Sequence, residues 1–329
     1  MKQRILGLVL LFFVCQTTVW SQKRTVGAIG FYNVENLFDM EDHPDKNDEE
    51  YTPTGDRGWD LERYTSKQAN LAKVLSEMAD GADVIGLSEV ENLFVLTELV
   101  ARPELAKHNY QIVHRESPDR RGIDCALIYK PNKFKVLNYK TLKFPQEGYD
   151  TRDILYVSGL YFGDTLNIFV NHWPSRFGGQ ADMRQLAASR LRQEVDSLLA
   201  INDQSKIIVM GDFNDDPINR SIKKELRAVD KKLEPGDLFN PAAEVFKQGV
   251  GTLYYRGAWN LFDQIIVSQG MLKEAKGISY KPSTFSIFGP DWMRVKTGQY
   301  AGGPLRSFGG GVYLDGYSDH FPTYILIEK

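Results

Sequence analysis

The stretch IIVMGDFNDDP, residues 207–217, begins as a buried strand and ends as a run of polar residues. Four apolar residues lead directly into a glycine, which Asp212, Phe213 and Asn214 follow. Side chains two positions apart in an extended strand lie on the same side. Asp212 and Asn214 are therefore expected to face one point together, as a proton acceptor beside a neutral amide.

Polar residues also stand at the ends of the other strands that the sequence predicts. Each of them alone is explained by a turn or a cap, because Asp, Asn and Gly favour those conformations. Agreement at six strand ends instead favours a functional site at the mouth of a sheet. The residues at these ends are Asn33, Glu35, Glu89, Asn171, His172, Asp212, Asn214, Asp263, Asp319 and His320.

The order of the predicted elements favours two sheets over one. Hairpins mixed with only a few strand–helix crossovers do not suit a doubly wound sheet. We therefore expect an α/β (α+β) fold, with two sheets packed face to face and helices outside, in a single domain over residues 23–329. The expected elements include strands over 25–34 and 82–90, helices over 61–80, 91–101, 181–200 and near 219–230, and a hairpin that turns at Gly163-Asp164.

The N-terminus has the pattern of a secretory signal peptide. Lys2 and Arg4 precede a short apolar run, and polar residues follow it before a cleavage site near residue 22. The run is too short for a membrane-spanning helix, which needs roughly 20 apolar residues. A core helix and a lipid anchor on Cys15 are the alternatives, but the bulky Val14 does not suit lipid attachment. We predict a signal peptide over 1–22, export to the periplasm or the medium, and no stable membrane insertion.

The charge of the chain argues against bulk electrostatic attraction to nucleic acid. The chain has 40 basic and 43 acidic residues, a formal net charge of −3. Proteins that bind phosphate backbones through bulk attraction are usually basic. Any contact with nucleic acid is therefore expected to be local and metal-assisted. No obligate protein partner is predicted.

Six short motifs follow one another along the chain: YNVEN, GLSEVEN, VNHWPSR, GDFND, FDQIIV and SDHFP. In this order and spacing they resemble the motifs of the endonuclease/exonuclease/phosphatase superfamily, from about residue 26 to the C-terminus. The resemblance implies a four-layer α/β sandwich. It also implies hydrolysis of a phosphate ester that depends on Mg²⁺, with Mn²⁺ as an alternative.

The resemblance further assigns the acidic residues to a metal site. Glu89 is expected to bind the ion, with Asn33 and Glu35 beside it and Asp319 completing the site. Glu35 stands where several relatives have Asp, so its longer side chain reaches either the metal or the water around it. Few protein ligands suit Mg²⁺, which typically uses one or two carboxylates and keeps several waters.

The same resemblance gives the remaining strand-end residues catalytic roles. Asp212 and Asn214 would handle the attacking water and the phosphate, and His172 would face the scissile group. Asp263 would orient His320, which in its cationic form can donate a proton to a phosphate oxygen. This pairing of Asp and His needs no serine nucleophile.

Substrate-binding residues are less strongly indicated. Arg121 and Arg176 are predicted to grip phosphate, because a guanidinium matches phosphate geometry, although solvated loop charge explains them equally well. Asn171 is grouped with these substrate-binding residues, and it is expected to support the loop that follows it. The segment LYYRGAWN, from Leu253, either stacks on a base or forms a corner of the core. The glycine-rich stretch 297–311 lacks the spacing of a phosphate-binding loop and is expected to cover the site.

These features together predict a secreted, metal-dependent endonuclease that acts on DNA or RNA. A phosphatase or a lipid phosphodiesterase of the same superfamily is the main alternative. A non-catalytic binding protein on an inherited enzyme fold is a third, but it would be expected to lack at least one of the acids or histidines, and none is missing.

Overall fold

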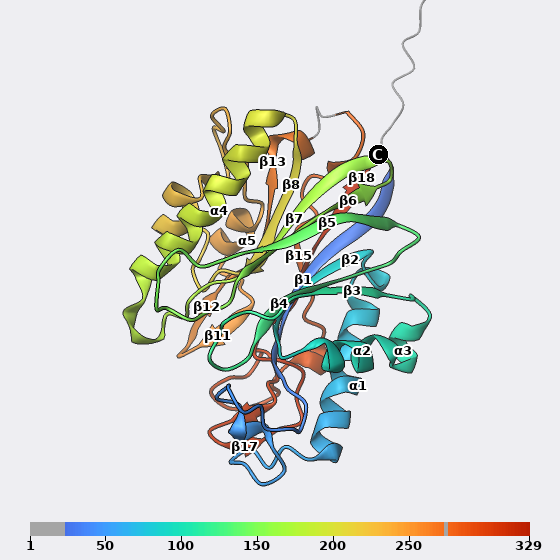
Figure 1. The fold of residues 1–329 in the computed structure, drawn as a ribbon, viewed down its shortest axis with the longest axis vertical. Coiled ribbons are helices and arrows are strands. Elements are labelled where there is room, and N and C mark those ends of the chain that lie inside the picture. The colour runs from blue at the N-terminus through green and yellow to red at the C-terminus, as the bar shows by residue number, and fades with distance from the viewer. Residues whose placement is uncertain (1–23, 273–275) are drawn as a thin grey trace, which may run out of the picture.

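The fold is built on two large β-sheets (Figure 1). The computed structural model describes residues 24–272 and 276–329, so the predicted signal peptide lies outside the described residues. The first sheet has the order β14 (Ser279–Tyr280), β18 (Thr323–Glu328), β1 (Thr25–Leu37), β2 (Val84–Val90), β4 (Asp124–Tyr129), β3 (Gln111–His114), and β15 (Ser286–Ile287) also pairs with β18. The second sheet has the order β5 (Phe134–Leu142), β6 (Ile154–Tyr161), β7 (Asp164–His172), β8 (Lys206–Asp212), β13 (Asp263–Ser268), β10 (Leu238–Phe239), β9 (Ala228–Val229).

Helices cover the outer face of each sheet, which confirms the predicted sandwich with helices outside (Figure 1). Residues of α1 (Leu61–Glu77) and α2 (Leu93–Ala101) share a hydrophobic cluster with β1 and β2, and residues of α4 (Ala181–Ile201) share one with β7 and β8. The smaller elements are α3 (Pro103–Ala106), α5 (Ala242–Lys247), and the hairpins β11 (Leu253–Tyr255) with β12 (Ala258–Asn260) and β16 (Phe308–Gly309) with β17 (Val312–Tyr313).

A third hydrophobic cluster fills the space between the two sheets. In β8, Ile208 and Met210 point into this cluster, whereas Ile207 and Val209 point toward α4. A strand with apolar neighbours on both faces needs a continuous apolar run, because successive side chains point to opposite faces. This requirement accounts for the four apolar residues that open the stretch at 207.

Two parallel strand pairs bring the polar strand ends to one edge of the sandwich. In the first sheet, β1 and β2 run parallel, and Asn33 pairs with Ser88. In the second, β7 and β8 run parallel with His172 opposite Asp212, and Asp263 at the start of antiparallel β13 lies opposite Asp212 as well. The carboxyl ends of both parallel pairs therefore meet where β13 begins.

Two local expectations differ from the structure. The β6–β7 hairpin turns at Phe162-Gly163, with φ of 49° and 88°, and Asp164 already belongs to β7. Two positive φ values match the turn that joins twisted strands most easily, and this geometry moves the turn by one residue. The helix expected near 219–230 is a single turn over Ser221–Glu225, because the chain then forms the short strand β9.

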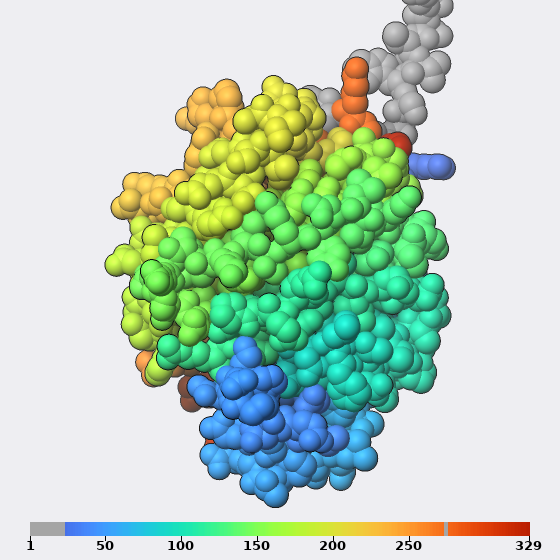
Figure 2. All heavy atoms as spheres, viewed as in Figure 1, coloured from blue at the N-terminus to red at the C-terminus, as the bar shows by residue number. Residues whose placement is uncertain are grey.

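Segments far apart in the sequence share one end of the molecule. The segment after β1 lies at the end where β17 is found, and residues from both segments line one pocket (Figure 1 and Figure 2). Within the described ranges, no helix combines the length and apolar character that crossing a membrane requires.

Asn171 and Gly211 fix the end of β7 against the end of β8. The Asn171 amide donates to the carbonyl oxygens of Phe169 at 3.2 Å and Met210 at 3.0 Å, and its Oδ1 accepts from Trp173 Nε1 at 3.1 Å. A Cβ on Gly211 would lie 2.3 Å from the Asn171 carbonyl oxygen. Only glycine lets the two backbones approach this closely.

We predict that Gly211→Ala destabilises the fold by about 1–3 kcal/mol, because the added methyl forces two buried strands apart. Chemical denaturation of the wild type and the variant measures the loss. Gly249→Ala is the control, since Gly249 has a positive φ but open space around its Cβ position. Gly249→Ala thus measures backbone strain without a close contact, and a loss below about 0.5 kcal/mol in Gly211→Ala would show that the close approach to Asn171 has no special cost.

Candidate active site

The floor of the site joins the two sheets through one amide group. Asn33 Nδ2, within the last part of β1, four residues before Leu37, donates to Asp212 Oδ2 at 3.0 Å and to Glu89 Oε1 at 3.3 Å. Asp212 belongs to β8 of the second sheet, and Glu89 belongs to β2 of the first. The site therefore lies across the open edge of the sandwich.

Several residues around this floor have strained backbone. Glu35, Asn36, Glu89 and Asn214 have φ values of 52°, 53°, 62° and 49°. Residues other than glycine pay on the order of 1–3 kcal/mol for such conformations, which persist where surrounding structure enforces them and often mark functional sites. At Glu89 the enforcing contact is the backbone N–H of Asn36, which donates to Glu89 Oε2 at 3.0 Å.

His320 is arranged to carry a positive charge. Its Nδ1 lies 2.7 Å from Asp263 Oδ2, and its Nε2 lies 3.8 Å from Asp212 Oδ2. Asp263 is itself fixed by a hydrogen bond from the Thr252 hydroxyl. Burial alone would lower the pKa of His320, but the charges of Asp263 and Asp212 outweigh it and raise the pKa well above its ordinary value.

His172 is arranged in the opposite way. Its Nε2 lies 3.7 Å from Asp212 Oδ2 and 3.8 Å from Glu89 Oε1. Burial lowers the pKa of His172 well below its ordinary value, and the charges of Arg152 and Arg121 add to this effect. The site thus combines a neutral and a cationic histidine beside one carboxylate.

The acidic residues of the site have the donor set of a divalent cation. Burial raises the pKa of Asp212 to about 7, with the charge of Asp263 adding to it against the opposing effect of His320. Carboxyl groups with raised pKa lack enough positive charge around them, and a hard cation with oxygen ligands supplies it. Ligand-type atoms of Asp212, Asp263 and His320 lie within 4.8 Å of one another, and Glu89 and Asp319, the predicted ligands, line the same cleft as Asp212.

Glu35 lies behind this group rather than in it. Its Oε2 accepts from the backbone N–H of Ser307 at 2.7 Å, and its Oε1 accepts from Arg306 Nε at 3.3 Å. Lys67 Nζ, fully buried in α1, lies 3.9 Å from the same carboxylate. Arg306 Nη2 also donates to Asp319 Oδ2 at 3.0 Å, so Arg306 connects Glu35 with Asp319, and a direct contact of Glu35 with the metal stays a prediction.

A cleft of about 1410 Å³ opens above the floor. It is lined by eight of the predicted site residues, whereas Asn33, Glu35, Asp263 and Asn171 do not border it; the eight are Glu89, Arg121, His172, Arg176, Asp212, Asn214, Asp319 and His320. Arginine and tyrosine side chains surround these groups, among them Arg120, Arg121, Arg152, Tyr254, Tyr255 and Tyr300. Of the segment LYYRGAWN, the tyrosines therefore face the cleft, while Trp259 stacks on Phe321, 6.1 Å between ring centres.

The structure corrects one of the three predicted substrate contacts. Asn171 is fully buried and its amide bonds within the protein, so it cannot touch a substrate, and these contacts suit the supporting role also expected of it. Arg176 lines the cleft while its guanidinium contacts Asp216 at 2.9 Å and Asn260 at 3.1 Å, and its contact with substrate stays a prediction. Arg121 does line the cleft, with Nη1 3.4 Å from Asn36 Oδ1, and its contact with substrate stays a prediction.

Arg306 is the cleft residue that sequence reasoning missed. It lies in the glycine-rich stretch 297–311, which does border the cleft through Tyr300, Gly303 and Gly310. The only signal in the sequence was an arginine in a loop expected to cover the site. Its two carboxylate partners lie 271 and 13 positions away, and no local pattern reports them.

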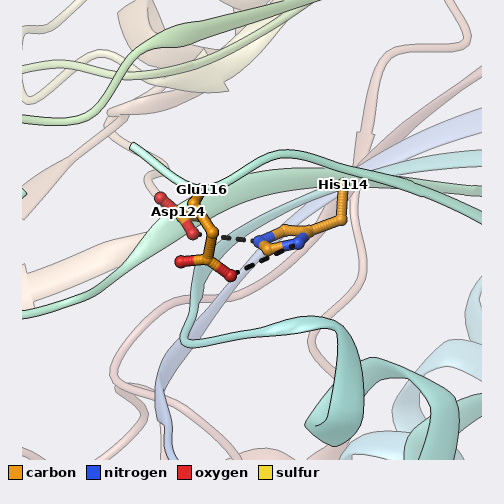
Figure 3. A group of neighbouring side chains, drawn as sticks. All are labelled: His114, Glu116 and Asp124. Atoms are coloured by element: carbon orange, nitrogen blue, oxygen red, sulfur yellow. Dashed lines mark hydrogen bonds and ion pairs between the residues drawn. The ribbon is translucent and has the colours of Figure 1, made fainter. Parts of the chain in front are cut away.

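A second group of ligand-type side chains lies outside the cleft (Figure 3). His114 Nε2 lies 2.9 Å from Asp124 Oδ2, and His114 Nδ1 lies 3.9 Å from Glu116 Oε1. His114 ends β3 and Asp124 begins β4, so their contact closes the base of the loop that carries Arg121. Glu116 is mostly exposed, and the buried contact between His114 and Asp124 accounts for the arrangement as a structural pair.

Comparison with known proteins decides which family this arrangement belongs to. A model of the endonuclease/exonuclease/phosphatase family matches residues 28–329. The chain belongs to this family. Its members are metal-dependent hydrolases of phosphoric esters, which agrees with the donor set on the cleft floor. No curated protein sequence matches the chain significantly.

Solved structures show the same fold at low sequence identity. TDP2 of D. rerio, complexed with a single-strand DNA product, is 16% identical with a TM-score of 0.58, covering 92% of this chain and 98% of that one. The human nocturnin catalytic domain with a bound sulfate is 16% identical, with a TM-score of 0.56 and coverage of 93% and 97%. A mannosyl-6-phosphatase of Bacteroides thetaiotaomicron is 17% identical, with a TM-score of 0.57 and coverage of 92% and 99%.

We predict that Asp263→Asn lowers the pKa of His320, because it removes the nearest negative charge from a buried imidazolium. The cationic form then persists only to a lower pH than in the wild type. An NMR titration of the His320 ring in metal-free protein measures the change directly. Asp203→Asn, which removes an exposed carboxylate from a loop after α4, is the control and should leave the His320 titration unchanged. An unchanged titration in Asp263→Asn would contradict the proposed pairing.

Proposed function

We propose that this family member is a divalent-metal-dependent phosphodiester hydrolase that cleaves DNA or RNA as an endonuclease. The observation that carries the proposal is the cleft: its volume of about 1410 Å³ holds the acids and histidines on its floor and arginines and tyrosines around them. Pockets for small ligands typically enclose roughly 300–1,000 Å³. This cleft therefore has room for substituents on both sides of a phosphate.

Glu89 and Asp319 would hold the metal, whose chemistry is to neutralise charge on the phosphate oxygens during displacement. Asp212 would accept the proton of the attacking water, since its raised pKa of about 7 suits a general base near neutral pH. The backbone N–H of Asn214 donates to Asp212 Oδ1 at 2.9 Å and fixes the direction of that carboxylate. The Asn214 side chain donates to the Trp173 carbonyl at 3.0 Å, which ties this residue to the end of the neighbouring strand β7 while its backbone N–H positions Asp212.

The two histidines would have different roles, one as a cationic donor and the other as a neutral hydrogen-bonding group. His320, held as a cation by Asp263, would donate to a phosphate oxygen as negative charge develops there. His172, held neutral, would hydrogen-bond the scissile group without adding a competing charge beside the metal. Asn33 would keep Glu89 and Asp212 at a fixed separation, so that metal and base act on one phosphate.

Nucleic acid is the substrate class that the wall of the cleft favours. Tyrosine rings can stack on bases, at about 1–3 kcal/mol each, and arginines can pair with backbone phosphates. The D. rerio TDP2 structure contains a single-strand DNA product, so this fold can accept a strand. The Bacteroides relative is a mannosyl-6-phosphatase, and phosphomonoester hydrolysis is therefore the competing outcome to test.

One experiment separates these outcomes. The mature protein is given supercoiled plasmid, single-stranded DNA, RNA and mannose 6-phosphate, with Mg²⁺ and with EDTA. We expect nicking or strand cleavage that EDTA abolishes, and Asp212→Asn should reduce the rate about 10²–10⁴-fold, the usual contribution of a general base. Asp203→Asn should keep the wild-type rate. Release of phosphate from the sugar with intact nucleic acid would replace the endonuclease with a phosphatase.

We further propose that the protein is exported before it acts. The support is the charged start, short apolar run and polar end of residues 1–22. Expression of the full chain with its own leader should give a mature protein that begins near residue 23 outside the cytoplasm, as N-terminal sequencing of the fractions would show. An uncleaved chain in the cytoplasm would rule export out.

A further inference from the structure

A smaller pocket adjoins the cleft and has no part in the proposed chemistry. It encloses about 240 Å³, and Arg306 and Gly310 line both the pocket and the cleft. Its other walls come from the segment after β1 and from the turn near β16, and they include Arg57, Tyr51 and Phe308. A volume below the usual range for small ligands suits one chemical group rather than a whole molecule.

Arg57 presents a guanidinium with free nitrogens to this pocket. Its Nε donates to Glu50 Oε2 at 2.9 Å, whereas its two terminal nitrogens have no hydrogen-bond partner among the described residues. The guanidinium lies 4.9 Å from the centre of the Phe308 ring and 5.9 Å from that of Tyr51. Stacking on these rings holds Arg57 in place without using the donors that an anion would need.

Arg306 offers a second guanidinium from the wall shared with the cleft. Its Nε and Nη2 are fixed by Glu35 and Asp319, and its Nη1 has no partner within residues 24–272 and 276–329. The two carboxylates fix the direction of the side chain, which remains about half exposed, at 47%. A guanidinium held in this way loses little conformational freedom when it binds an anion.

The charges of both guanidiniums are paired with carboxylates, Arg57 with Glu50 and Arg306 with Glu35 and Asp319. Glu35 is buried in the pocket wall, where its carboxylate also accepts from Ser307 N–H and lies 3.9 Å from Lys67 Nζ. The N–H donors of Arg57 and Arg306 that have no partner among the described residues remain available to an anion. Oxygen atoms of phosphate are the ligands that guanidinium groups bind in pairs.

We propose that this pocket binds a second phosphate group of the substrate, next to the phosphate that is hydrolysed in the cleft. Arg306 links the two positions, because it borders the pocket and contacts Asp319 on the cleft floor. The substrate class is then a molecule with two phosphates one unit apart, as in an oligonucleotide. This inference rests on the proposed phosphodiesterase activity and adds a requirement for a neighbouring anion.

The test compares substrates that differ by one phosphate. Binding of a dinucleotide with and without an added terminal phosphate, at either end, is measured by titration calorimetry in Mg²⁺ with the Asp212→Asn variant. We expect the added phosphate to tighten binding about 10-fold at one end, as a charge-assisted contact to a guanidinium allows. Arg57→Gln should remove this preference and Arg57→Lys should keep part of it. Arg220→Gln, which removes an exposed arginine bound to Glu225, is the control and should keep all of it.

Separate results would overturn the two proposals. Equal binding of the dinucleotides with and without the extra phosphate, or the same loss of preference in Arg220→Gln, would refute the second phosphate site. Failure of wild-type protein to hydrolyse either dinucleotide or bis(p-nitrophenyl) phosphate in Mg²⁺ would refute the phosphodiesterase activity. If Arg57→Gln lowers the unfolding temperature, Glu50→Gln serves instead: it removes the carboxylate paired with Arg57 and should strengthen the preference, and an unchanged preference would count against the second phosphate site.

Discussion

The hydrogen bonds of the Asn33 amide are the constraint on which the rest of the site depends. One amide donates to Asp212 on the second sheet and to Glu89 on the first, so it fixes the distance between groups that come from different layers. A shift of either sheet by one residue would turn one of these side chains away, because strand side chains alternate between faces. The packing between the sheets and the close contact of Gly211 with Asn171 therefore determine the geometry of the floor.

The electrostatic surroundings then give two histidines of the site different protonation states. His320 and His172 lie beside the same carboxylate of Asp212, at 3.8 and 3.7 Å. Their pKa values nevertheless move in opposite directions, because Asp263 directly contacts His320, whereas His172 is buried near Arg152 and Arg121. Pairs of groups whose surroundings separate their pKa values are typical of sites that need an acid and a neutral donor at the same pH.

The sequence predicted which strand ends meet, but not the contacts that support them. Asp212 and Glu89 were predictable as neighbours because they end apolar strands, and strand ends gather at one edge of a sheet. The endonuclease/exonuclease/phosphatase motifs added the fold and the expected metal. Arg176 was predicted to grip phosphate because of its residue type, but its carboxylate partners in the loop come near only in the folded chain. Arg306 was missed for the same reason, since its partners are distant in sequence.

The unfavourable backbone angles at Glu35, Asn36, Glu89 and Asn214 set a limit on how far this protein can be made heat-resistant. Engineers commonly gain stability by replacing residues in left-handed conformations with glycine, which adopts them without strain. At Glu89 that exchange would delete a predicted metal ligand, and at Asn214 it would keep the backbone N–H that holds Asp212 but delete the side chain that donates to the Trp173 carbonyl. A variant that must keep its activity therefore cannot be stabilised by glycine at these positions. Stabilising substitutions have to be made in helices and loops remote from the cleft.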